Sequence, residues 1–221
     1  MLALIHFNFC PFCQRVRLAL GYKQLAFNEI DARFYGPEYF LDISGFDRLP
    51  VIVYDDGTRQ SESMEIIADL DRRFPETSSL LQENILPEEM DSVLAWRTRI
   101  SGPLFRLLAP VLTQYPGLGD DDRAMQYYRP RMETWLEDNL EGLSENRHTW
   151  YAAMLPDIEW VTERVTRNGF FSTCFSAADA LITADLTGLR MLKDIELPAA
   201  LRAYFSRVED AAGITLLPGS C

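Results

Sequence analysis

The chain has 221 residues, of which 48% are hydrophobic, so it can form one large domain or two smaller ones. Its formal net charge is −12, which argues against a nucleic-acid partner and against an electrostatic hold on an anionic membrane. No apolar segment approaches the ~20 residues that a membrane-spanning helix needs. The four cysteines are too few for a disulfide scaffold, and the N-terminus has no signal-peptide pattern, so we expect a protein of the reducing cytoplasm.

Residues 1–77 alternate between strand and helix patterns. The apolar run 2–7 predicts a buried strand, and helical spacing follows from residue 11 to 22. Asp55–Gly57 is typical of a hairpin turn, so the strands on either side of it are expected to be antiparallel. Further strands are predicted at 25–30, 50–54 and 58–60, and further helices at 36–44 and 61–74. The order βαβ followed by ββα predicts a small α/β sheet with helices on both sides.

Beyond residue 77 the strand patterns disappear. The hydrophobic period lapses over 78–86, which predicts a linker. Gly102–Pro103 is expected to kink or split the first helix that follows. Helices are predicted at 87–115, 122–143, 156–167, 176–193 and 198–210. We therefore predict an α/β domain over 1–77, a linker over 78–86 and an all-helical domain over 87–221.

The segment Cys10–Cys13 (CPFC) lies between the first predicted strand and the first predicted helix, where a Cys-x-x-Cys pair is typical of a dithiol redox motif. The free N–H groups at a helix start stabilise negative charge, and the thiolate is the nucleophilic form of cysteine. Cys10 is therefore the predicted attacking thiol. Cys13, one turn further in, is expected to be more buried and could resolve a mixed disulfide formed at Cys10. Pro11 suits the first helical position, and Arg15 and Arg17 could add positive potential.

The alternative interpretation of this motif is a pair of structural thiols or half of a zinc site. Zinc would need two further Cys or His ligands at suitable spacing. The candidates are scattered without pair spacing: Cys174, Cys221, His6 and His148. We therefore expect no metal. His6 is interpreted as a satisfied core or edge residue.

Three other segments carry weaker signals. Leu49–Pro50 stands at the entry of a predicted strand, where proline is usually trans and only blocks an edge. Glu62–Ser63 opens a predicted helix and fits either an ordinary cap or a site for a ligand carboxylate and ammonium. Ser176 and Asp179 form an N-cap pattern, and we expect Asp179 to be buried against backbone donors with a structural role.

Five aromatic residues of the predicted helical domain lie at helical spacings. Such stripes are mainly core, and some members could instead line a cleft that faces Cys10. The five are Trp96, Phe105, Tyr127, Tyr128 and Trp135.

Together these segments resemble the glutathione transferase superfamily over the whole chain. The Cys-Pro-aromatic-Cys motif is similar to that of its glutaredoxin-like branch, the large bacterial glutaredoxins with a transferase-like helical body. The resemblance implies a thioredoxin-like domain followed by an α-helical bundle. It also implies that Pro50 is cis, that the Leu49 backbone pairs with glutathione like an added strand, and that Glu62 and Ser63 hold the γ-glutamyl end. Cys10 would face the glutathione sulfur, beside Phe12.

The sequence departs from the glutaredoxin pattern at two places. Phe12 replaces a frequent Tyr, and Asn8–Phe9 precedes the motif where glutaredoxins often carry a Lys. The glycyl carboxylate of glutathione is thus left without an assigned partner, for which Arg48 or Arg33 is a candidate.

The predicted function is a glutathione-dependent thiol–disulfide oxidoreductase with glutathione as cosubstrate, no metal, and a disulfide as substrate. One alternative is a transferase that conjugates glutathione to an electrophile. The other is a non-enzymatic binding module of the same fold. The resemblance leaves the oligomeric state open between a monomer and a homodimer.

Overall fold

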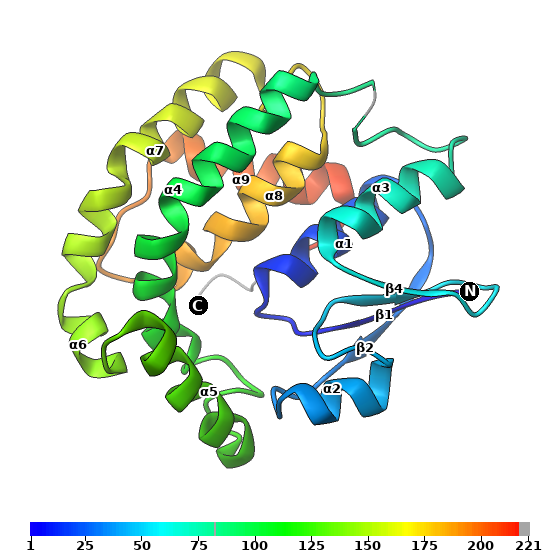
Figure 1. Cartoon of the computed structure of the whole chain (residues 1–221). Coiled ribbons are helices and arrows are strands. Elements are labelled where there is room, and N and C mark those ends of the chain that lie inside the picture. The colour runs from blue at the N-terminus through cyan, green and yellow to red at the C-terminus, as the bar shows by residue number, and fades with distance from the viewer. Residues whose placement is uncertain (82, 217–221) are drawn as a thin grey trace.

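A four-stranded mixed sheet forms the N-terminal part of the fold (Figure 1). The computed structural model describes residues 1–81 and 83–216. Strand β1 pairs in parallel with β2 and antiparallel with β3, which in turn pairs antiparallel with β4, so the strand order is β2-β1-β3-β4. The strands are β1 (Leu2–His6), β2 (Phe27–Asp31), β3 (Val51–Val53) and β4 (Arg59–Ser61).

Helices cover both faces of this sheet because β1 is apolar on both sides. Leu4 packs in the core that includes α1 (Pro11–Tyr22) and α3 (Ser63–Arg73). Ile5, on the opposite side of the strand, packs with Phe40 of α2 (Pro37–Ser44). The predicted βαβ–ββα order is therefore confirmed.

The rest of the described chain is helical. Helix α8 is its centre, because all ten of its residues are buried. Helix α1 of the sheet domain packs directly against α8 (Figure 1). No helix of residues 1–81 and 83–216 is long and apolar enough to cross a membrane. The helices are α4 (Pro87–Leu112), α5 (Asp122–Leu136), α6 (Leu140–Glu145), α7 (Arg147–Asn168), α8 (Ala177–Leu186), the 3₁₀ turn η1 (Thr187–Met191) and α9 (Ala199–Ala212).

One hydrophobic core joins the sheet and the helical bundle. It runs from Leu4 and Ile67 in the first part to Trp96 and Leu181 in the second, all of them without solvent exposure. The division at 1–77, 78–86 and 87–221 stays a prediction, since the two parts are held together by this shared core. Residues 217–221, including Cys221, lie outside the described residues.

Several predicted helix boundaries are wrong, for local reasons. The helix expected to run to residue 143 ends at Leu136, because Glu137 adopts a left-handed backbone (φ 59°) and the Asn139 side chain caps a new helix by accepting from the N–H of Gly142. The helix expected at 176–193 ends at Leu186 and continues only as the 3₁₀ turn η1.

Two other helices continue through proline residues. Helix α7 begins at Arg147, with Pro156 in its interior, although proline favours the first turn. Helix α4 is not split at Gly102–Pro103 and continues through Pro110. Both helices contribute buried apolar faces to the shared core, and this packing offsets the missing N–H groups.

Asp179 ties the start of α8 to the chain around it. Its carboxylate accepts hydrogen bonds from the N–H groups of Phe171 (2.7 Å) and Ser176 (2.9 Å). It also accepts from the hydroxyls of Ser176 (3.0 Å) and Tyr204 of α9 (2.8 Å). Burial raises the pKa of Asp179 to about 6, against the opposing effect of these donors. Ser176 and Asp179 thus form a capping box that also reaches α9.

Asp179→Ala should lower the free energy of unfolding by more than about 3 kcal/mol, because four buried donors lose their acceptor and each costs about 1–3 kcal/mol. Urea unfolding measures the change. The control is Asp210→Ala, an exposed residue of α9, where we expect a change within about 0.5 kcal/mol. Similar losses in both variants would contradict a structural role for Asp179.

Candidate active site

Cys10 occupies the junction between β1 and α1. It is the N-cap residue of α1, with an extended backbone (φ −83°, ψ 121°), and Pro11 is the first helical residue. The Cys10 carbonyl already accepts from the N–H of Gln14 (3.0 Å). The N–H groups of Phe12 and Cys13 donate to the sulfur of Cys10, and the residue is partly exposed. A helix start therefore supplies the donors for a thiolate at this position.

The two thiols of the motif have opposite pKa shifts. The hydrogen bond from the Cys13 thiol is the main reason that the pKa of Cys10 is lowered, and backbone N–H groups and Arg15 act in the same direction against burial. Burial raises the pKa of Cys13 well above its usual value. The Cys13 sulfur also accepts from the N–H of Phe7 at 3.4 Å. Both cysteines are free thiols in this structure, and the opposite pKa shifts make Cys10 the one that loses its proton more readily.

Arg15 and Arg17 do not act alike. Arg15 contributes to the lowered pKa of Cys10. Arg17 points to the other side of α1, where it pairs with Glu29 (2.9 Å). Its charge acts on Cys13, whereas that of Arg15 acts on Cys10.

A cleft of about 1260 Å³ opens over Cys10 between the sheet domain and helices α4 and α5. Phe9, Phe12 and Leu49 line it from the sheet domain. On the helical side, the five predicted aromatic residues divide between the core and the cleft wall. Trp96 lies in the core without exposure, whereas the other four line the cleft. The four are Phe105, Tyr127, Tyr128 and Trp135.

The predicted glutathione residues fall into two groups. Leu49 lies in the cleft wall with Cys10 and Phe12, and the Leu49–Pro50 peptide bond is cis. Glu62 and Ser63 lie at the start of α3, outside that wall.

Arg48 connects the start of α3 to the cleft. It lines the cleft and pairs with the exposed Glu62 carboxylate at 3.1 Å. Arg33, the other candidate for the glycyl carboxylate, lies beside Gly117 instead. The ordinary cap expected at this helix is absent, since Glu62 is the N-cap residue, has φ 70° and makes no side-chain cap hydrogen bond.

The sequence analysis missed a charged cluster beside Phe12. The guanidinium carbons of Arg15 and Arg97 lie 4.6 and 4.9 Å from the centre of the Phe12 ring. Both arginines pair with Asp185 of α8. These residues come from α1, α4 and α8, so no local pattern joins them. The one signal in the sequence was a second aspartate near the end of a mostly apolar helix.

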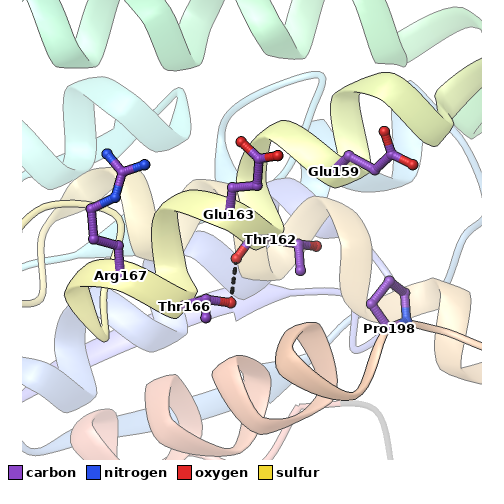
Figure 2. A pocket seen from close by; sticks show the side chains of 6 residues that line it. All are labelled: Glu159, Thr162, Glu163, Thr166, Arg167 and Pro198. Atoms are coloured by element: carbon purple, nitrogen blue, oxygen red, sulfur yellow. Dashed lines mark hydrogen bonds between the residues drawn. The ribbon is translucent and has the colours of Figure 1, made fainter.

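Two features lie apart from this chemistry. His6 is buried in β1, and its Nε2 lies 2.9 Å from a carboxylate oxygen of Glu29 on the neighbouring strand β2, so the buried ring has a charged partner. A smaller hollow of about 480 Å³ lies between α7 and Pro198, and none of its six lining residues is a cysteine. Figure 2 shows these six side chains. Within 1–81 and 83–216, no three His, Cys, Asp or Glu side chains are grouped to hold a metal ion.

A sheet domain joined in this way to a helical bundle defines the glutathione transferase fold, and solved structures share it over nearly their whole length. One is glutaredoxin 2 from Salmonella typhimurium in complex with glutathione, with 18% identity, a TM-score of 0.83, and coverage of 98% of this chain and 96% of that chain. Another is glutathione transferase GSTFuA3 from Phanerochaete chrysosporium, with 14% identity, a TM-score of 0.80 and 98% coverage of both chains. A third is the glutathione S-transferase CsGST83044 of Ceriporiopsis subvermispora in complex with glutathione, with 19% identity, a TM-score of 0.74, and coverage of 96% and 98%.

Family models give the more specific assignment. The model of the glutaredoxin 2 C-terminal domain matches residues 92–220, more than half of the chain. The model of the glutathione S-transferase N-terminal domain matches residues 4–78. The chain therefore belongs to the glutaredoxin 2 family, which confirms the resemblance. Among curated proteins, none matches its sequence.

The lowered pKa of Cys10 predicts alkylation by iodoacetamide with a pH midpoint below the ~8.5 of a free cysteine thiol. Below that midpoint the thiolate is protonated and the rate falls. Cys13→Ala should raise the midpoint, because it removes the thiol that donates to Cys10. Mass spectrometry of the Cys10 peptide at a series of pH values measures the rates, with free glutathione as the reference. A midpoint equal to that of the reference would contradict the assignment.

Proposed function

We propose that this protein is a glutathione-dependent thiol–disulfide oxidoreductase with Cys10 as its nucleophile. The observation that carries the proposal is the thiol pair at the helix start: Cys10 lines the cleft and has a lowered pKa, whereas Cys13 is buried and has a raised pKa. A thiolate next to a protonated thiol is suited to thiol–disulfide exchange. Membership of the glutaredoxin 2 family supports the same activity.

The reaction begins on a mixed disulfide of glutathione. The Cys10 thiolate attacks the glutathione sulfur, a disulfide forms between Cys10 and glutathione, and the original S–S bond breaks. The second thiol leaves as a thiolate and takes a proton from solvent. A glutathione thiolate then attacks the Cys10 adduct, which releases oxidised glutathione and regenerates the Cys10 thiolate. Alternatively Cys13 loses its proton and displaces glutathione, which leaves a Cys10–Cys13 disulfide.

We assign the glutathione subsite to the sheet domain. Leu49 precedes Val51, the first residue of β3, and lies outside the paired part of that strand, so its backbone can take an added strand. The cis Pro50 follows it directly. Phe12 provides an apolar wall, and Glu62 and Ser63 at the start of α3 hold the γ-glutamyl end. Two proteins of the same fold were solved with glutathione, glutaredoxin 2 from Salmonella typhimurium and CsGST83044.

The partners and the compartment follow from the chemistry. Glutathione and a disulfide are the substrates, and the net charge of −12 disfavours nucleic acids and anionic membranes. A dithiol that must be kept reduced fits the cytoplasm. The protein acts as a monomer or a homodimer.

The aromatic helical side of the cleft favours one alternative, a glutathione transferase that acts on an apolar electrophile. The rings of Phe105 and Trp135 meet edge to face, with centroids 4.9 Å apart, and Trp135 is exposed. The weakness of this alternative is Cys10, because a cysteine thiolate forms a disulfide with the ligand. A binding module without activity would not need the Cys10 thiolate.

Cys10→Ser should abolish reduction of the mixed disulfide of glutathione and 2-mercaptoethanol, because it removes the nucleophile. Cys13→Ser should keep much of this activity, since a second glutathione can resolve the adduct. A coupled assay of glutathione oxidation measures both. Conjugation of glutathione to 1-chloro-2,4-dinitrobenzene is measured in parallel. Disulfide reduction by Cys10→Ser, or conjugation without disulfide reduction in the unmodified protein, would overturn the proposal.

A further inference from the structure

Three charged side chains meet beside the Cys10 site, where the two domains join. Arg15 comes from α1, Arg97 from α4 and Asp185 from α8, three helices that gather in Figure 1. Asp185 lies 2.5 Å from a terminal nitrogen of Arg15 and 3.0 Å from Nε of Arg97. The side chains of Arg15 and Asp185 are each 3% exposed, and that of Arg97 is 26% exposed.

The cluster has one positive charge in excess, because a single carboxylate serves two guanidiniums. Burial of charge without a counter-charge is unfavourable, so the cluster favours anions beside it, and the Cys10 thiolate is one such anion. The charge of Arg15 acts on the Cys10 thiolate. Arg97 has not been given a comparable role at Cys10. Burial lowers the pKa of Arg97, although the negative charge of Asp185 acts to raise it.

Arg97 is oriented toward the cleft. The Asp185 carboxylate accepts a hydrogen bond from Nε of Arg97. The two terminal nitrogens of Arg97 make no hydrogen bond within the described part of the chain. Arg97 lines the cleft together with Cys10 and Phe12, and its guanidinium lies over the Phe12 ring. A half-buried guanidinium with two free amino groups is a fork suited to a carboxylate.

We propose that Arg97 binds a carboxylate on the thiol that Cys10 releases from a glutathione mixed disulfide. This inference rests on the proposed function. Glutathione occupies the sheet-domain side of the cleft at Leu49, so the other half of the disulfide faces α4 and α5. The preferred substrate is therefore a glutathione mixed disulfide whose second thiol carries a carboxylate near its sulfur. Asp185 is a positioning residue, because it holds Nε and leaves the terminal nitrogens for the substrate.

The step itself is the exchange already described. The bond between Cys10 and the glutathione sulfur forms as the original S–S bond breaks, and the carboxylate-bearing thiol leaves as a thiolate that takes a proton from solvent. Arg97 neither gains nor loses a proton. Its effect is on the binding of the substrate, so it should appear as selectivity between substrates.

The test compares two substrates, the mixed disulfides of glutathione with mercaptoacetate and with 2-mercaptoethanol. The unmodified protein should have the higher kcat/KM for the mercaptoacetate disulfide. Arg97→Gln should reduce kcat/KM for that disulfide about 10- to 100-fold, the effect of losing a charge-assisted hydrogen bond. It should leave the 2-mercaptoethanol disulfide within about 2-fold of its original value. Arg97→Lys should recover part of the preference, since it keeps the charge and loses the fork.

The matched control is Arg99→Gln, which removes the same charge two residues along α4. Arg99 is exposed and pairs with Asp157 of α7, outside the cleft, so the preference should be unchanged. Equal kcat/KM for the two disulfides in the unmodified protein would overturn the inference while the proposed function stands. So would an equal loss for both in Arg97→Gln, which would place Arg97 on the glutathione half. Failure to reduce either disulfide would overturn the proposed function itself.

Discussion

The hydrogen bond from the Cys13 thiol to Cys10 sets the chemistry that this fold can perform. Burial by itself disfavours either thiolate, and it raises the pKa of Cys13. The pKa of Cys10 moves the other way because its sulfur stands at the helix start and accepts from both the thiol and the backbone N–H groups. Of the two thiols, the one that lines the cleft is therefore the easier to ionise, and the buried one is the harder.

Helix α1 links this thiol pair to the rest of the molecule. Its first turn carries the two cysteines, and its body packs on α8, the most buried helix of the described chain. Asp185 of α8 is therefore able to reach Arg15 behind the motif and Arg97 at the cleft wall. The helical domain is thus part of the site in two ways, through the charge that it brings to Phe12 and through the aromatic wall opposite Cys10.

Periodicity predicted the strands and most helices correctly, because apolar faces must alternate as the secondary structure does. Predicted helix boundaries were wrong where core packing or an unusual backbone conformation outweighed the local sequence preference. Pro156 and Pro103 lie inside helices that the core holds together, and Glu137 ends α5 in a left-handed conformation that few residues other than glycine adopt. The capping box at Ser176 was readable because both its members lie within four residues of sequence.

The sequence alone determined the order of elements, the thiol pair at a helix start and the capping box, since each depends on residues close together in the chain. Only the tertiary structure decided which aromatics line the cleft, that Arg48 reaches Glu62, and that Arg15, Arg97 and Asp185 share one charge cluster. The physical reason is the distance along the chain. Side chains from α1, α4 and α8 meet only when the shared core brings those helices together, and no local pattern records that contact.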